Sequence, residues 1–404
     1  MKSLKISKEA KNAIFIGTLC SVAYLAVYVA KNALSAVAPQ ITGQGAFTVE
    51  EIGVFSSAYY ITYAIGQLIN GIIGDKIKAK IMISFGLVLA AVVFFAFPFL
   101  TNASGAATLV YAASGFFLAM IYAPLTKVVA ENTKPEYATR CSLGYTLSSF
   151  LGSPVSGYLA AFMTWQSVFF SCSAVLAVMG VCVFVCFSFL EHKGIVRYGR
   201  FVPQETSPIK NIKVLIKREI IRFALVAIIT GIVRTSVVFW LPTYISQYLG
   251  FNASDSALIF SVSTLALSFS AFIAVFSYER LNRNIHLVML LGFIFSSISF
   301  LSLFFVKNAT ANIIIMVVAI LSSNCASSIL WSRYCPSLFD TGMVSSATGF
   351  LDFCSYMAAS AASLIFANAV NIIGWDGLIL VWFAIVFCGI FVSIKFKKAD
   401  KEKV

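Results

Sequence analysis

Long apolar stretches recur along the whole chain, with only short polar gaps between them. A helix that crosses a bilayer needs about 20 predominantly apolar residues, and these stretches reach that length. The first stretch is too long for a cleaved signal peptide and lacks a clear cleavage site, so we retain it as a helix. The pattern predicts twelve membrane-spanning helices. They cover residues 12–38, 51–74, 80–100, 107–130, 141–163, 166–189, 220–247, 255–278, 285–306, 311–331, 343–370 and 375–396.

Composition supports an all-α membrane protein and excludes a water-soluble one. Hydrophobic residues make up 60% of the chain, charged residues make up 11%, and the mean hydropathy is +0.91. A soluble domain carries about a quarter charged residues, so this chain has too little polar surface to face water.

The net charge of +13 reports topology, and we expect no nucleic-acid partner. Twenty-five of the 29 Lys and Arg residues lie in gaps that alternate to one side of the predicted helices, whereas the opposite gaps hold only Lys307. Basic residues collect on the cytoplasmic face of a membrane. Both termini are therefore predicted to be cytoplasmic, which requires an even number of spans, and we expect a multi-pass protein of the cell membrane in contact with lipid.

A duplicated six-helix unit is predicted by the central gap and by two pairs of landmarks. The longest polar segment, residues 191–219, divides the predicted helices six and six, with bundles at 1–190 and 220–404. Asp75 and Glu279 are 204 residues apart, and Lys31 and Arg234 are 203 apart. Nearly equal offsets are typical of internal repeats, so we predict two pseudo-symmetric bundles joined by a basic cytoplasmic linker.

The usual parts of an enzyme are missing from the pattern. The nine cysteines have no metal or redox spacing, and neither His192 nor His286 lies beside a plausible nucleophile or cysteine pair. We therefore expect no enzyme activity, no metal site and no cofactor.

Of the charged residues inside the predicted spans, four stand out as candidates for the site: Lys31, Lys127, Arg234 and Asp352. A charge at the bilayer centre costs at least about 2.5–3.5 kcal/mol, so it is seldom placed there without a use. Three cations against one carboxylate favour an anionic substrate. Arg234 is the leading candidate, because a guanidinium makes two parallel hydrogen bonds to phosphate or carboxylate.

Each of these residues also has a structural interpretation. Arg234 could form an internal salt bridge with Asp352. Lys31, which shares a helix face with Tyr24 and Tyr28, could extend along the helix to the membrane surface. Lys127 could pair with Glu131 one turn later.

Particular segments resemble a known family. The segment GQLINGIIGDKIKAK (66–80) is similar to the loop 2–3 signature of the major facilitator superfamily, although Lys78 stands where a glycine is expected. Other segments resemble the organophosphate:phosphate antiporters, which include the glycerol-3-phosphate and hexose-phosphate transporters. They are YVAKNALSAVAP (28–39), GFFLAMIYAPLTK (115–127), RTSVVFWLPTYI (234–245), SSATGFLDFCSYMAASAA (345–362) and GWDG (374–377).

This resemblance implies a major facilitator fold, a monomer, and exchange of a phosphorylated metabolite for inorganic phosphate. It also implies that helices 1, 4 and 7 line a central site, that Arg234 holds the phosphate, and that Lys127 matches a basic helix 4 residue. Two positions depart from the family pattern. Ala30 replaces an arginine directly before Lys31, and Ser148 or Ser149 replaces a histidine. These departures put phosphate itself in doubt more than an anionic substrate.

Our site prediction places the acidic group of the substrate on Arg234, assisted by Lys31 and Lys127. Its neutral part would meet aromatic side chains of helices 1, 2 and 7. These are Tyr24, Tyr28, Tyr63, Trp240 and Tyr244. Cytoplasmic gates that break and reform as the bundles rock are predicted at Asp75, Lys76, Glu279 and Arg280.

Two other functions remain open. Asp352 could bind and release a proton, which would give proton-coupled symport of a carboxylate or other organic anion. A transporter-like receptor, binding the ligand without flux and signalling through the basic segment 191–219, is the third hypothesis.

Overall fold

A computed structural model describes residues 7–74, 77–198, 214–341 and 344–394, and over these ranges the chain forms helices and no strands. In the first half these are α1 (Lys8–Gly43), α2 (Val49–Gly74), α3 (Ala79–Ala96), η1 (Phe97–Phe99), α4 (Ser104–Leu118), α5 (Tyr122–Asn132), α6 (Pro135–Phe162) and α7 (Trp165–His192). In the second half they are α9 (Ile220–Gly231), η2 (Ile232–Val237), α10 (Val238–Gln247), α11 (Ala253–Leu267), α12 (Ser270–Arg280), α13 (Ile285–Phe305), α14 (Ala309–Ile329), η3 (Leu330–Tyr334), η4 (Pro336–Thr341) and α15 (Val344–Ser393).

The helices confirm the all-α membrane class and refine the predicted spans. Ten helices in the described chain are long and apolar enough to cross a membrane. The fifth predicted span lies in α6, and α15 contains the last two, which meet at Gly374 with a left-handed φ of 66°. The predicted fourth and eighth spans are each divided in two, into α4 and α5 and into α11 and α12.

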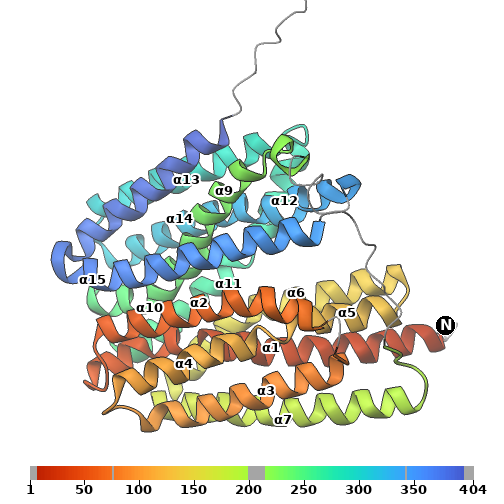
Figure 1. The fold of residues 1–404 in the computed structure, drawn as a ribbon. Coiled ribbons are helices and arrows are strands. Elements are labelled where there is room, and N and C mark those ends of the chain that lie inside the picture. Colours follow the sequence, from red (N-terminus) through yellow and green to blue (C-terminus); the bar gives the residue numbers. More distant parts are fainter. Residues whose placement is uncertain (1–6, 75–76, 199–213, 342–343, 395–404) are drawn as a thin grey trace, which may run out of the picture.

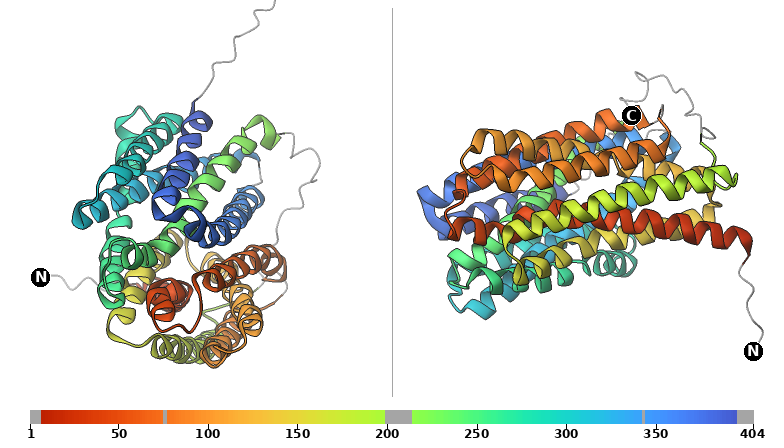
Figure 2. Two further views of the ribbon diagram at one scale, coloured as in Figure 1. Left: turned by 90° about the vertical axis from the view of Figure 1, so that its left-hand side faces the viewer. Right: turned by 90° about the horizontal axis from the view of Figure 1, so that it is seen from below.

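The helices gather into two groups, one from residues 8–192 and one from residues 220–393 (Figure 1). The seam between them is formed by α1, α2 and α6 of the first group, which pack against α10, α15 and α11 of the second. The helix α1 begins at the right-hand end of the molecule in the right view of Figure 2. We call the end at which α1 begins the terminal end, and the opposite one the closed end.

Hydrogen bonds join the two groups toward the closed end. Ser254 donates to the carbonyl of Ala161 at 2.5 Å, and Ser261 donates to the carbonyl of Pro154 at 2.6 Å. The hydroxyls of Ser57 and Ser360 lie 2.9 Å apart, and Asn371 donates to Glu50. Small residues allow this approach: a Cβ on Gly157 would lie 2.8 Å from the carbonyl oxygen of Ala257.

At the terminal end, the ion pairs between described residues join residues of the same group. Lys134 pairs with Glu9 at 2.6 Å, and Lys80 with Glu191 at 2.5 Å, both within the first group. Arg222 pairs with Glu219 at 3.2 Å in the second group. The hydrogen bonds named above thus join the groups toward the closed end, and these ion pairs lie within each group.

Candidate functional site

Arg234 lies on a widened helical turn in the middle of the seventh predicted span. Residues Ile232–Val237 form a π-helix between α9 and α10, and this turn packs against α15. Gly231 makes the close approach possible, because a Cβ there would lie 2.8 Å from the carbonyl oxygen of Ser355. Single π-helical turns are frequent at functional sites, because the extra residue turns a side chain away from the regular helical direction.

The Arg234 guanidinium keeps at least one N–H group that no described residue accepts as a hydrogen bond. Its side chain is half-buried, and Nε has no hydrogen-bond partner among the described residues. The guanidinium interacts electrostatically with Asp352. It also interacts with three tyrosines, Tyr28, Tyr63 and Tyr356. The ion pairs of the described chain do not include one between Arg234 and Asp352, so the salt bridge that the sequence allowed is not formed.

Lys31, on α1, points into the seam between the two groups. Its ammonium donates a hydrogen bond of 2.7 Å to the hydroxyl of Tyr356 on α15. The same Nζ lies 4.3 Å from the ring centroid of Tyr63, 4.5 Å from that of Tyr356 and 5.3 Å from that of Tyr28. A cation in contact with aromatic faces gains about 0.5–2 kcal/mol per contact. These contacts hold Lys31 across the seam, away from the membrane surface.

Tyr356 was not predicted from the sequence, although it completes this arrangement. It follows Asp352 by four residues and precedes Ser360 by four, so the three share one face of α15. Ser360 contacts Ser57 on α2, and the ring of Tyr356 lies 6.3 Å from that of Tyr60. A polar residue at every fourth position in a membrane helix is the signal that could have identified this face.

The predicted aromatic residues are divided between the seam and the packed interior. Tyr28 and Tyr63 contact Lys31, and Tyr24 packs edge-on against Tyr28 at 4.9 Å. Trp240 is 1% exposed and packs edge-on against Phe239 at 5.3 Å. Tyr244 donates to Asn312 at 2.6 Å. The structure thus brings Tyr28 and Tyr63 to Lys31, and it holds Tyr244 against α14 inside the second group.

The remaining predicted residues lie toward the terminal end. Lys127 is half-buried on α5, and Glu131 is buried with neither carboxylate oxygen hydrogen-bonded in the described chain, so the expected hydrogen bond from Lys127 is not formed. Glu279 and Arg280 are exposed at the end of α12, where the Arg280 guanidinium lies 5.3 Å from the ring of Phe276. Asp75 and Lys76 lie outside the described residues.

Lys31, Arg234 and Asp352 form the electrostatic core of this site. Both cations act on the Asp352 carboxylate, which takes no part in the ion pairs of the described chain. Among the residues that the structure describes, no group of three His, Cys, Asp or Glu side chains is placed to bind a metal. The guanidinium, the ammonium and the tyrosine hydroxyls gathered here are groups that can bind an anion.

Comparison with known proteins identifies the family to which the chain belongs. The model of the Major Facilitator Superfamily matches residues 20–363. The chain is 26% identical over 283 residues to the glycerol-3-phosphate transporter of Bacillus subtilis (strain 168). The aligned region covers 62% of this chain and 60% of that protein. It is 23% identical to the phosphoglycerate transporter protein of Salmonella typhimurium over 97% of this chain and 89% of that one.

A shorter match is to a relative that is named as a sensor and not as a transporter. Over 94 residues, 23% of this chain and 21% of the relative, the chain is 32% identical to the membrane sensor protein UhpC of Salmonella typhimurium. Among solved structures, that of the D-xylose-proton symporter has the same fold, with a TM-score of 0.71, 12% identity, and coverage of 98% of this chain and 100% of that one. With the family model matched over most of its length, the chain belongs to the Major Facilitator Superfamily, a family of membrane transporters and not of enzymes.

Proposed function

We propose that this transporter exchanges a phosphorylated metabolite for inorganic phosphate by alternating access of one central site. The observation that carries the proposal is the Arg234 guanidinium, which has an unbonded Nε and no carboxylate partner in the described chain, beside a second cation at the seam. A half-buried cation that forms no ion pair within the protein is costly inside a membrane unless a ligand supplies further negative charge. The names of the two transporter relatives, for glycerol-3-phosphate and phosphoglycerate, support the same substrate class.

The two cations come from opposite groups, which suits an exchanger. Arg234 belongs to the second group, and Lys31 belongs to the first. An anion held by both would link the two groups and lower the barrier to their relative movement. Lys31 already reaches across the seam to Tyr356, so a bound phosphate would join an existing contact.

The asymmetry of the two ends indicates how access would alternate. We propose that residues 1–190 and 220–404 act as two bundles joined by the segment 191–219, and that the terminal end is cytoplasmic. The site would then open to the cytoplasm in the conformation described, since the bonds between groups lie toward the closed end. Reorientation would break the Ser57–Ser360 contact and bring Glu279 and Arg280 toward the first group.

The decisive experiment is counterflow in proteoliposomes loaded with phosphate. We expect uptake of labelled phosphate, inhibition by glycerol phosphates, and persistence of exchange when the proton gradient is collapsed. Substitution Arg234→Ala should abolish the exchange. Exchange that survives in Arg234→Ala, in protein that is folded and correctly inserted, would refute the proposed site.

A second candidate, anion:proton symport, rests on Asp352. Its carboxylate lies under the influence of Lys31 and Arg234 but is not ion-paired in the described chain, so it is placed to exchange a proton as anions come and go. Symport predicts that accumulation requires a pH gradient and that Asp352→Asn uncouples it. Exchange predicts that Asp352→Asn still performs counterflow. Saturable binding with no flux under either condition would instead favour a receptor.

A further inference from the structure

A groove separate from the central site lies where α9 begins and α15 ends. Its volume is about 450 Å³. The residues that line it are Ile221, Arg222, Leu225, Phe391, Val392 and Ile394. Both helices belong to segments long and apolar enough to cross a membrane, so we expect the groove to face lipid.

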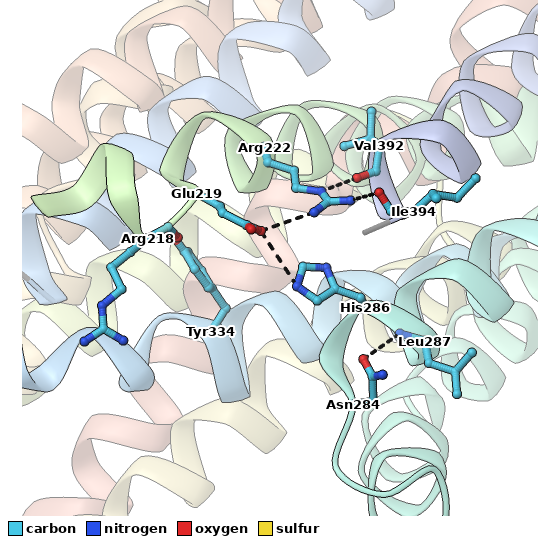
Figure 3. Close-up of polar contacts among 9 residues, drawn as sticks. All are labelled: Arg218, Glu219, Arg222, Asn284, His286, Leu287, Tyr334, Val392 and Ile394. Carbon is cyan, nitrogen blue, oxygen red and sulfur yellow. Dashed lines mark hydrogen bonds and ion pairs between the residues drawn. The ribbon is translucent and has the colours of Figure 1, made fainter. Parts of the chain in front are cut away.

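Among the described residues that line the groove, only Arg222 is charged, and three of its guanidinium N–H donors are already hydrogen-bonded (Figure 3). Nε donates to the carbonyl of Val392 at 2.5 Å, Nη2 donates to the carbonyl of Ile394, and Nη1 donates to Glu219 at 3.2 Å. A guanidinium has five N–H donors, so two remain beyond these three bonds. His286 lies 3.7 Å from the same carboxylate oxygen of Glu219, which therefore serves two neighbours.

The walls of the groove are apolar and uncovered. Ile221 is 63% exposed, Leu225 is 45% exposed and Phe391 is 59% exposed. Exposed apolar side chains on a membrane helix contact acyl chains, because no water is available there. The mouth is basic, because Lys217 and Arg218 are exposed just before α9.

We propose that this groove binds an anionic phospholipid, with an acyl chain against Leu225 and Phe391 and the phosphate on the two spare donors of Arg222. Basic pockets between helices at the membrane surface recognise such headgroups. A zwitterionic lipid would carry no net charge for this basic mouth, and a soluble phosphate ester would leave the apolar walls uncovered. Because α9 continues directly into the π-helical turn, the bound lipid would steady the helix that bears Arg234 twelve residues later.

The test compares lipids on the purified full chain in detergent micelles. Phosphatidylglycerol should raise the melting temperature by roughly 2–4 °C. Phosphatidylcholine with the same acyl chains, and soluble glycerol phosphate, should produce less than half of that shift. Substitution Leu225→Trp fills the groove without touching Arg222 and should remove the gain. The control Leu265→Trp, at a site on α11 that is 46% exposed and does not line the groove, should keep it.

A second variant separates headgroup recognition from packing. Lys217→Gln removes a charge from the mouth and should reduce the gain from phosphatidylglycerol while leaving the effect of phosphatidylcholine unchanged. An equal gain in Leu225→Trp and the unmodified chain would overturn the proposal, as would equal gains from the two lipids or a full gain from glycerol phosphate. A gain that is lost on ending the chain at Ile394 but kept in Leu225→Trp would also overturn it, by moving the lipid to the terminal segment.

Discussion

Lys31 and Arg234 are the paired positions of the predicted repeat, and their surroundings in the structure differ. Lys31 lies on α1, an uninterrupted helix of 36 residues, and its ammonium is engaged by the hydroxyl of Tyr356 and by three aromatic rings. Arg234 lies on a π-helical turn, and its Nε has no partner in the described chain. One cation is engaged across the seam and the other keeps donor capacity for a ligand. In the proposed exchange, Lys31 would couple the two groups and Arg234 would bind the anion.

The first and seventh predicted spans contact each other at the seam. Ser35, four residues after Lys31, donates a hydrogen bond of 2.6 Å to the carbonyl of Phe239. Repeats related by a pseudo-two-fold axis would bring these two spans together, and the duplication stays a prediction.

The largest effect is expected at the free guanidinium. Arg234→Ala should lower phosphate exchange by about 100-fold or more, since truncating one partner of a buried charge-assisted contact costs about 2–5 kcal/mol. Arg234→Lys keeps the charge and loses the two-pronged geometry, so an intermediate loss of about 10-fold is expected. Initial rates of exchange in proteoliposomes measure both.

Arg333 provides the matched control for this pair of variants. It also lies on a π-helical turn, η3, but its guanidinium packs 5.0 Å from the ring of Tyr278 on α12. Arg333→Ala should therefore keep the thermal stabilisation that phosphate gives to the unmodified protein. Equal losses of phosphate binding in Arg234→Ala and Arg333→Ala would show that a general charge effect, and not a site, had been measured.

A second prediction tests whether closure of one end matters for access. Gly157→Leu places a side chain against the carbonyl of Ala257, and overpacking of this kind costs about 1–3 kcal/mol. The ratio of the conformation closed at this end to the open one should fall by about 5- to 150-fold, and exchange should slow by about 5-fold or more. Gly105→Leu is the control, because a Cβ on Gly105 has no neighbour within 4 Å. An unchanged exchange rate in Gly157→Leu would argue against closure at this end during the cycle.

Lys31 should be the next most sensitive position. Lys31→Met keeps most of the side-chain volume and loses both the hydrogen bond to Tyr356 and the contacts with the rings. We expect about 10-fold weaker exchange, with substrate affinity and turnover both reduced, because this ammonium contributes charge and also links the two groups. Measured KM and maximal rate separate the two contributions. A change in KM alone would assign Lys31 to binding only.

Sequence was sufficient for the membrane fold because apolar length is a local property of the chain. It was insufficient for the breaks within helices. The π-helical turn at Arg234 depends on Gly231 packing against Ser355, and these residues are 124 positions apart. The division of the eighth span at Ser268 likewise coincides with a contact across the seam, since its hydroxyl donates to the carbonyl of Phe150 at 3.4 Å. No pattern within one helix records such contacts.

In the candidate site too, some residues could be identified from their own segment of sequence, and others depend on contacts with distant segments. Lys31, Arg234 and Asp352 could be singled out because charges are rare inside membrane spans. Tyr356 carries no charge, so only its spacing of four residues from Asp352 and from Ser360 marks it in the sequence, and its partner Lys31 lies 325 residues away. Trp240 and Tyr244 were chosen from a sequence motif, and they pack inside the protein, where their rings contact Phe239 and Tyr248.

The smallest predicted effect distinguishes the hydroxyl of Tyr356 from its ring. Tyr356→Phe removes the acceptor for Lys31 but keeps the aromatic face 4.5 Å from the ammonium. A hydrogen bond of this kind contributes about 0.5–1.5 kcal/mol, so exchange should fall by about 2- to 10-fold. The control is Tyr60→Phe, whose ring packs near Tyr356 and is not in contact with Lys31.

Combining Tyr356→Phe with Lys31→Met reveals whether the two residues act as one unit. If Lys31 works through its bond across the seam, the double variant should be little worse than Lys31→Met alone, because the second change removes a contact already lost. Multiplying effects would mean that the Tyr356 hydroxyl meets the substrate directly. In that case Lys31 would resemble Arg234 more closely than their surroundings suggest, and the division of roles between the two halves would have to be abandoned.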